Sequence, residues 1–327
     1  MLDGLRVIEQ FAYYDGSTAW CVMIANLTSL LAGFMEPTWA RDVFGPANAI
    51  GGGYAMVAGR GRVVSGGVRV SGRWAWGSGS PHCTALGGGV LVLGDDGKPI
   101  TLPDGSRTPF MFFDRADVTL HDTWHVSGLK GTTSGDYSVT DTFVPDGRWV
   151  DILSRKLVPV VDSTLYRFPF YGGFAVAVAT VLAGLARRAV DELVALGDKM
   201  PMGSTKTLAS RAVVQADLAR ADALVRSSRA FVDDAVGQAW AATEVGGASL
   251  EHRRLLRLAA ASMAEQCVRA IEICYRAGGG SSIFETSPLQ RVLRDGNVAT
   301  QHGMIAPRLL EIVGLVRFGL DADTRMF

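Results

Sequence analysis

From about residue 170 onward, apolar residues recur at three- and four-residue steps, which is the spacing of an amphipathic helix. Three long stretches of this kind cover residues 174–196, 209–242 and 252–277. A run of three glycines ends the third stretch, and a fourth helix is expected to begin after Pro288 and to carry His302. Four long helices in succession predict an up-and-down bundle, in which alanine-rich faces allow the helices to pack closely.

The first 44 residues show the same spacing in two shorter stretches. Asp15 and Gly16 separate these stretches, since both residues disfavour the interior of a helix. The side chain of Asp15 or Ser17 is expected to cap the second helix.

Residues 45–160 have a different character, because glycine is dense and short runs of β-branched or aromatic residues recur. Turn sequences separate these runs at Asp96-Gly97, Asp104-Gly105 and Pro145-Asp146-Gly147. The pattern predicts a compact antiparallel β domain, either a sandwich or a barrel.

The predicted fold class is therefore α+β. Its parts are a partial N-terminal helical domain (1–44), a central β domain (45–160) and a C-terminal four-helix bundle (161–327).

The balance of charge disfavours several kinds of partner. The chain has 32 basic and 32 acidic residues, so neither nucleic acid nor an anionic membrane is expected as the main partner. We expect no membrane-spanning run and see no secretion signal, which together indicate a cytoplasmic protein. The cysteines form no CxxC pair and indicate reduced core residues and no metal site; they are Cys21, Cys83, Cys267 and Cys274.

The first candidate site is the segment SGRWAWGSGSPHC, residues 71–83. Trp74 and Trp76 would lie on the same side of a strand, and the small residues after them would let a ligand approach the backbone. Together they could form a wall for a planar ring. The alternative is a hairpin whose tryptophans fill the β core.

The second candidate site is the glycine triplet that precedes Ser281 and Ser282. Backbone N–H groups at the start of the next helix could bind an anion or a ring rich in carbonyl groups. The triplet is not a GxGxxG motif after a strand, and no Walker lysine follows it, so a Rossmann or P-loop site is not predicted. The alternative is an ordinary helix C-cap followed by a tight turn.

The third candidate is His302, a single imidazole among small neutral residues. Its simplest interpretation is a core or interface histidine. No nucleophile elbow, HExxH motif or cluster of metal ligands is seen in the sequence.

The order of helices, β domain and helical bundle resembles the acyl-CoA dehydrogenase superfamily over nearly the whole chain. Three segments carry the resemblance. WHVSGLKGTTSGDYSVTDTFVPDGRW (124–149) resembles a family turn and strand, GRWAWGSG resembles the strand beside the flavin ring, and AGGGSS with SPLQRVLRD resembles the flavin-contacting turn and helix. Relative to that family, Met1 begins near the middle of the N-terminal domain.

The catalytic glutamate of the dehydrogenases is absent. Aligning Arg294-Asp295 with the family's RD pair places Gly303 at the glutamate position, and the second glutamate site of the family falls in GGFAVAVATV, which has no carboxylate. The chain instead resembles the branch of flavin-dependent two-component monooxygenases. That resemblance implies catalytic roles for Ser78, near flavin N5, and for His302, near the reacting oxygen.

The resemblance also implies the remaining contacts. The flavin-contacting residues would be Trp20, Trp76, Gly77, Ser78, Lys199, Gly280, Ser281, His302 and Gly303, and the substrate-contacting residues would be Asn26 and Phe174. Two departures stand out. Asn26 and Thr28 lie where this branch often has a histidine that holds a phenol, and Lys199 stands in place of a phosphate-binding arginine.

The resulting hypothesis is an oxygenase component that takes reduced FMN, or alternatively FAD, from a separate reductase and hydroxylates a small apolar aromatic or polycyclic substrate with O2. A homotetramer is expected from the alanine-rich helices. The alternatives are an FAD-dependent acyl-CoA dehydrogenase with a different base, and a flavin-free truncated homologue.

Overall fold

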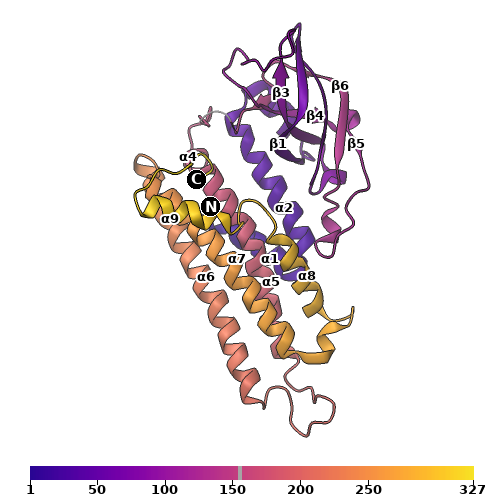
Figure 1. The fold of residues 1–327 in the computed structure, drawn as a ribbon, viewed down its shortest axis with the longest axis vertical. Helices are drawn as coiled ribbons and strands as arrows, with labels where there is room; N and C mark the ends of the chain where they lie inside the picture. Colours follow the sequence, from indigo (N-terminus) through magenta and orange to yellow (C-terminus); the bar gives the residue numbers. More distant parts are fainter. Residues whose placement is uncertain (154–156) are drawn as a thin grey trace. The chain divides into compact units, whose positions relative to one another are not determined.

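The computed structural model describes residues 1–153 and 157–327 and forms a mixed α/β fold with two compact units (Figure 1). The helical unit comprises Met1–Trp20, Val126–Gly131 and Phe168–Phe327. The sheet unit comprises Cys21–His125 and Thr132–Arg167.

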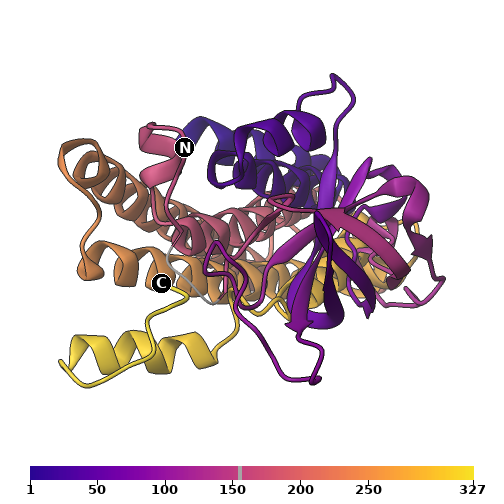
Figure 2. The same cartoon turned by 90° about the horizontal axis from the view of Figure 1, so that it is seen from above.

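The helical unit is built around the long apolar helix α5 (Phe170–Ala195). Its elements are α1 (Leu2–Tyr14), the start of α2 (Gly16–Ser29), α5 (Phe170–Ala195), α6 (Ala212–Val245), α7 (Leu250–Ala277), η5 (Gly279–Ile283), α8 (Pro288–Ala299) and α9 (Arg308–Arg317). Helix α5 packs against α7, α1 and α8, and α7 packs against α6 (Figure 1). The last helix, α9, packs on α7 (Figure 2).

Small residues allow the helices around α5 to approach closely. A Cβ atom at Gly184 would lie 2.4 Å from the backbone oxygen of Glu9 in α1, and one at Gly172 would lie 2.7 Å from the side chain of Leu256 in α7. Larger side chains at these positions would push the helices apart, so the glycine and alanine content of α5 serves helix packing.

Two helical segments are long and apolar enough to cross a membrane by length and composition, which corrects the expectation that there are none. In Phe170–Ala195 the most apolar window is 83% buried, as in the core helix of a folded unit. Gly16–Phe34 lies near the N-terminus and its window is 33% buried. Both are weak indications of a membrane span, because core helices and signal sequences have the same composition.

The predicted helix boundaries near Asp15 and Gly278 are confirmed. Asp15 accepts a hydrogen bond from the backbone N–H of Thr18 at 2.7 Å and so caps α2. Helix α7 ends at Ala277, directly before the glycine triplet.

The prediction that the last long helix carries His302 is wrong. Helix α8 ends at Ala299, and His302 lies in the bend that follows. Gly303 and Pro307 come next, and both disfavour a continued helix. The imidazole is therefore held by a turn, in which the N–H of His302 donates to the carbonyl of Ala299 at 3.2 Å.

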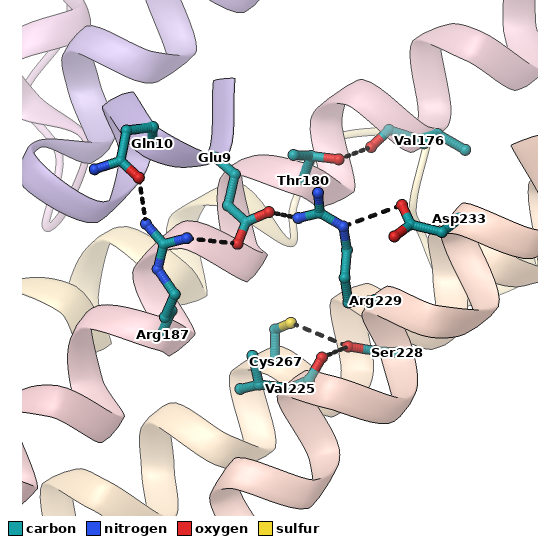
Figure 3. A network of polar contacts seen from close by, with 10 residues as sticks. All are labelled: Glu9, Gln10, Val176, Thr180, Arg187, Val225, Ser228, Arg229, Asp233 and Cys267. Carbon is teal, nitrogen blue, oxygen red and sulfur yellow. Dashed lines mark hydrogen bonds and ion pairs between the residues drawn. The ribbon is translucent and has the colours of Figure 1, made fainter. Parts of the chain in front are cut away.

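A buried carboxylate joins α1, α5 and α6 (Figure 3). Glu9 forms ion pairs with Arg187, at 3.0 Å, and with Arg229. Arg187 also donates to Gln10 at 2.8 Å, and Arg229 donates to Asp233 at 3.1 Å. Each charge in this network has a partner of opposite sign or a hydrogen-bond acceptor, as burial requires.

Replacing Glu9 with glutamine is expected to lower the free energy of unfolding by roughly 1–3 kcal/mol. The full cost of breaking a buried pair is not expected, because the Arg187 side chain is 36% exposed and can reach water. Urea unfolding followed by circular dichroism measures the change. Asp222→Asn is the control, since its pair with Arg226 is exposed, and a loss as large as that of Glu9→Gln would contradict the role of burial.

The sheet unit contains one seven-stranded sheet in the order β5-β6-β2-β1-β3-β4-β7. The strands are β1 (Gly51–Val64), β2 (Gly67–Trp74), β3 (Ala85–Leu93), β4 (Phe110–Asp114), β5 (Thr119–Leu120), β6 (Tyr137–Pro145) and β7 (Trp149–Val150). Around them lie the rest of α2, η1 (Leu30–Phe34), α3 (Pro37–Phe44), η2 (Ser80–His82), η3 (Arg115–Asp117) and α4 (Thr164–Arg167), while η4 (Lys130–Thr132) begins in the helical unit.

The expectation of purely antiparallel pairing is wrong for the central strands, because β1 and β3 are parallel. Strand β2 ends at Trp74, toward the end of the sheet at which β1 begins. Residues 75–84 then carry the chain past β1, so that Ala85 pairs with Gly51 and β3 runs in the same direction as β1. The predicted turn glycines Gly97, Gly105 and Gly147 are confirmed, since all have positive φ.

Candidate functional site

His302 lies between two aromatic rings of the helical unit. The ring centroid of Trp20, at the start of α2, is 5.5 Å from the imidazole at an interplanar angle of 70°. The ring of Phe174, in α5, is also 5.5 Å away and is tilted by 54°. Three of the residues predicted from the sequence thus come together, although they are more than 100 positions apart in the chain.

The hydrogen bonding of His302 determines which nitrogen carries its hydrogen. The backbone N–H of Met304 donates to Nδ1 at 3.2 Å, so Nδ1 is an acceptor and the hydrogen of the neutral ring lies on Nε2. Burial, together with the charge of Arg257, lowers the pKa of His302 to about 4. At neutral pH the imidazole is therefore uncharged and offers one N–H donor.

Arg257 is a functional candidate that sequence reasoning missed. It lies in α7 and is only 1% exposed. Its Nη1 donates to the carbonyl of Tyr171 at 3.3 Å and lies 3.9 Å from the sulfur of Met304. Burial lowers its pKa to about 10, so the group remains a cation at neutral pH. The available signal was an arginine between Leu256 and Leu258, followed by three alanines, in an apolar stretch of the helix.

The Arg294-Asp295 pair has a structural role in the helical unit. Asp295 accepts a hydrogen bond from the backbone N–H of Leu129 at 2.6 Å, and Arg294 donates to the carbonyl of Ser127 at 3.0 Å. A Cβ atom at Gly128 would lie 2.3 Å from the backbone oxygen of Arg294, so the two segments touch. Burial raises the pKa of Asp295. These contacts fix α8, the helix that leads to His302.

In the sheet unit the two tryptophans of the first candidate segment have different surroundings. Trp74 is fully buried, whereas Trp76 is 57% exposed. The expectation that both face the same side of a strand is wrong, because β2 ends at Trp74 and Trp76 adopts a positive φ of 57°. Trp74 thus fills the core, and the exposed indole of Trp76, which contacts Tyr54 edge to face, is available to a ligand.

Ser78 belongs to a chain of buried hydroxyl groups. Its Oγ is 2.8 Å from the Oγ of Ser134, which is 2.7 Å from the Oγ1 of Thr132. Beside it, the N–H of Gly77 donates to the carbonyl of Gly135 at 3.0 Å, and a Cβ atom at Gly77 would collide with the ring of Tyr137. An exposed indole can stack on a flat ring, and a serine hydroxyl can donate or accept a hydrogen bond.

The other predicted contacts lie in separate local environments. Gly280 and Ser281 form part of η5, where Ser281 donates to the carbonyl of Gly278 at 2.9 Å. Lys199 is exposed in the turn after α5, and Gly303 is exposed beside His302. In the sheet unit, Asn26 donates to the carbonyl of Val22 within α2 at 2.8 Å.

Across residues 1–153 and 157–327, no group of three or more His, Cys, Asp or Glu side chains could hold a metal ion. No disulfide bond links the four cysteines. Burial raises the pKa of Cys83, Cys267 and Cys274 to about 12 in each case, so these thiols are inert.

Comparison with known proteins confirms the resemblance seen in the sequence. Residues 176–307 match the family model described as "Acyl-CoA dehydrogenase, C-terminal domain". The chain is 29% identical to indole-3-acetate monooxygenase of Pseudomonas putida over 96% of its own length and 79% of the relative. It is 26% identical to the flavin-dependent monooxygenase oxygenase subunit HsaA of Rhodococcus jostii, over 98% of this chain and 84% of the relative.

Solved structures show the same relationship. The structure of XiaF from Streptomyces sp., in complex with FADH2 and glycerol, has a TM-score of 0.89 and 25% sequence identity. The match covers 98% of this chain and 82% of that chain. The chain is thus similar in sequence to a flavin-dependent oxygenase subunit and in fold to a protein that binds FADH2.

Proposed function

We propose that this chain is the oxygenase component of a two-component flavin-dependent monooxygenase, which hydroxylates a small aromatic or polycyclic substrate with reduced flavin and O2. The observation that carries the proposal is the uncharged His302 between Trp20 and Phe174, next to the position at which the related dehydrogenases have a glutamate. A neutral imidazole can hold a proton at a reacting oxygen, whereas a carboxylate base would favour abstraction of a substrate α-proton.

The flavin supplies the reactivity with O2 when it is bound. The exposed ring of Trp76 and the hydroxyl of Ser78 would hold the flavin ring, and Gly77 would keep its edge accessible. Trp20 and Phe174 would exclude water from the reacting oxygen. His302 would donate a hydrogen bond from its Nε2–H to that oxygen, since Nδ1 is occupied by the N–H of Met304.

The same proposal covers the identity of the flavin, its further contacts, the partner protein and the location. We assign reduced FMN as the cofactor, with FAD as the alternative, and expect Lys199, Gly280, Ser281 and Gly303 to contact it. The name "oxygenase subunit" of the HsaA relative implies a separate partner, and for this chain we propose a flavin reductase. A cytoplasmic location, a barrel or sandwich form of the sheet unit and a four-helix bundle around α5 complete the proposal.

An anaerobic titration with reduced FMN and reduced FAD, followed by addition of O2 and an aromatic substrate, tests the proposed function. We expect tight binding of reduced flavin and formation of a hydroxylated product. Reduction of bound oxidised FAD by a short-chain acyl-CoA would show a dehydrogenase instead. Absence of flavin binding would show a flavin-free homologue.

Replacing Ser78 with alanine is expected to lower the fraction of reduced flavin that yields hydroxylated product by roughly 2- to 10-fold, since one hydrogen bond contributes about 0.5–1.5 kcal/mol. Affinity for reduced flavin should change little. Product and hydrogen peroxide are measured together for the wild type, Ser78→Ala and the control Ser65→Ala, which lies in the exposed turn between β1 and β2. Equal product yield in all three proteins would exclude the role of Ser78.

The chain is expected to form a homotetramer through its alanine-rich helices. Light scattering at micromolar concentration measures the mass, and the chain mass of 34.8 kDa makes a tetramer easy to distinguish from a monomer. A monomer that still binds reduced flavin tightly would contradict this expectation.

A further inference from the structure

Arg257 is a buried cation without a counter-ion. None of its ion pairs or hydrogen bonds within residues 1–153 and 157–327 involves a carboxylate, and the residues outside those ranges are Ser154, Arg155 and Lys156, which carry none. Among the residues that the structure describes, its Nε has no hydrogen-bond partner. Within the same residues, its Nη1 bonds to the carbonyl of Tyr171 and to the sulfur of Met304.

Such an arrangement is unfavourable in the protein alone. A guanidinium has five N–H hydrogens, and burying it without an opposite charge costs several kcal/mol. The contrast with Arg254, one turn earlier in α7, is direct: Arg254 donates to both carboxylate oxygens of Glu251, at 2.7 and 2.6 Å. A buried charge that the fold does not neutralise is typical of a site where a ligand supplies the partner.

The surroundings of Arg257 indicate the kind of ligand. Met304 connects it to the proposed site, since the Met304 sulfur lies against the guanidinium while its backbone N–H holds the imidazole of His302. His302 offers a second donor at Nε2, and Trp20 and Phe174 supply aromatic surface. The surroundings thus combine two donor groups, the guanidinium of Arg257 and the Nε2–H of His302, with one positive charge and two aromatic rings.

We propose that Arg257 determines substrate specificity by binding an anionic oxygen, a carboxylate or a phenolate, of the aromatic substrate. The assignment rests on the proposed function, because it deepens the description of the same site. The guanidinium contributes charge and directed N–H donors to the anion, while the Nε2 hydrogen of His302 remains available for the reacting oxygen.

Equilibrium binding to the purified full chain tests the proposal without any reaction. Indole-3-acetate and indole-3-acetamide have nearly the same shape and differ in charge, so they test a carboxylate. 4-Nitrophenol and 4-nitroanisole test a phenolate, and the absorption spectrum of bound 4-nitrophenol shows whether it is ionised. We expect the anion of one pair to bind roughly 10- to 100-fold more tightly than its neutral counterpart. Whichever pair shows the preference identifies the source of the anionic oxygen.

Two substitutions separate recognition from a structural role. Arg257→Met should abolish the preference for the anion and raise the Tm of the ligand-free protein, because it removes an unpaired buried charge. Arg257→Lys should retain part of the preference, since it keeps the charge. The control is Arg254→Met, which removes a neighbouring buried arginine whose charge is already paired and should leave the preference unchanged.

Several results would overturn the proposal. The first is equal binding of both members in both pairs, and the second is an undiminished preference for the anion in Arg257→Met. The third is an Arg257→Met protein that loses only affinity for reduced FMN, which would assign the guanidinium to the flavin. An Arg257→Met protein that does not fold would show a structural role, and the proposal would then fail unless a folded Arg257→Lys protein showed a weakened preference. Selective anion binding without flavin-dependent hydroxylation would refute the proposed function alone.

Discussion

An enzyme in which His302 is replaced by alanine is expected to hydroxylate its substrate roughly 10²–10³-fold more slowly, the usual effect of removing one fixed hydrogen-bond donor from a developing charge. The reason is the single N–H donor of the neutral ring, at Nε2, which alanine lacks. Reduced flavin should still bind and react with O2, so its consumption should be diverted to hydrogen peroxide. Product and peroxide, measured per reduced flavin consumed, give the result.

Two further variants show whether that loss reflects a role of His302 in the reaction or only in packing. His125→Ala removes an exposed histidine of the sheet unit and should leave hydroxylation unchanged. His302→Glu places a carboxylate beside the position of the dehydrogenase base and should also fail to hydroxylate. Normal hydroxylation by His302→Glu, without oxidation of an acyl-CoA, would mean that His302 only packs against Trp20 and Phe174. Loss of fold in His302→Ala would lead to the same structural interpretation.

The helical framework of this site could be predicted from the sequence because it depends on local patterns. Apolar spacing identified α5, α6 and α7, and Asp15 and Gly278 marked helix ends through their backbone and capping preferences. The protonation state of His302 could not be predicted in this way. It depends first on burial of the imidazole, then on the charge of Arg257, which lies 45 positions away in the chain (302 − 257), while the N–H of Met304 determines the tautomer.

Arg257 was missed for a related reason. Periodicity assigns a position to a buried face but does not show whether a polar side chain there finds a partner. Arg254 and Arg257 lie on the same helix and both are buried, yet only Arg254 has a carboxylate within reach. Glu251 lies three residues before Arg254 in α7, whereas the positions three and four residues from Arg257 on the same helix carry no carboxylate.

In the sheet unit, the sequence located the strands and turns but not the path between β2 and β3. The alternation rule for Trp74 and Trp76 holds only within a strand, and β2 ends between them. The parallel pairing of β1 with β3 likewise follows from the direction in which residues 75–84 cross, which no local propensity specifies.

The environment of Trp74 shows how much of the sheet depends on one side chain. Cβ atoms at Gly88, Gly59 and Gly72 would lie 2.3, 2.4 and 2.7 Å from its ring, so the ring lies directly on three strands without side chains in between. Its Nε1–H donates to the carbonyl of Gly89 at 3.0 Å, and its ring stacks on Tyr137 at 5.5 Å. The three glycines have no side chains that could fill the space left by the ring.

Replacing Trp74 with alanine is therefore expected to lower the free energy of unfolding by about 3–5 kcal/mol, the range for truncating a large aromatic core residue. The upper part of that range is favoured because the socket of glycines cannot collapse around the cavity. Urea unfolding followed by far-ultraviolet circular dichroism measures the loss, since tryptophan fluorescence would change with the substitution itself. The free energy of unfolding of Trp74→Phe should lie between those of the wild type and Trp74→Ala, because phenylalanine keeps an aromatic ring but loses the bond to Gly89.

Trp76→Ala is the matched control. The ring of Trp76 is 57% exposed, so its removal should change the free energy of unfolding by no more than about 0.5 kcal/mol. The same substitution should weaken the binding of reduced flavin. If Trp76→Ala destabilised the protein as much as Trp74→Ala, the assignment of one tryptophan to the core and the other to the ligand would be wrong.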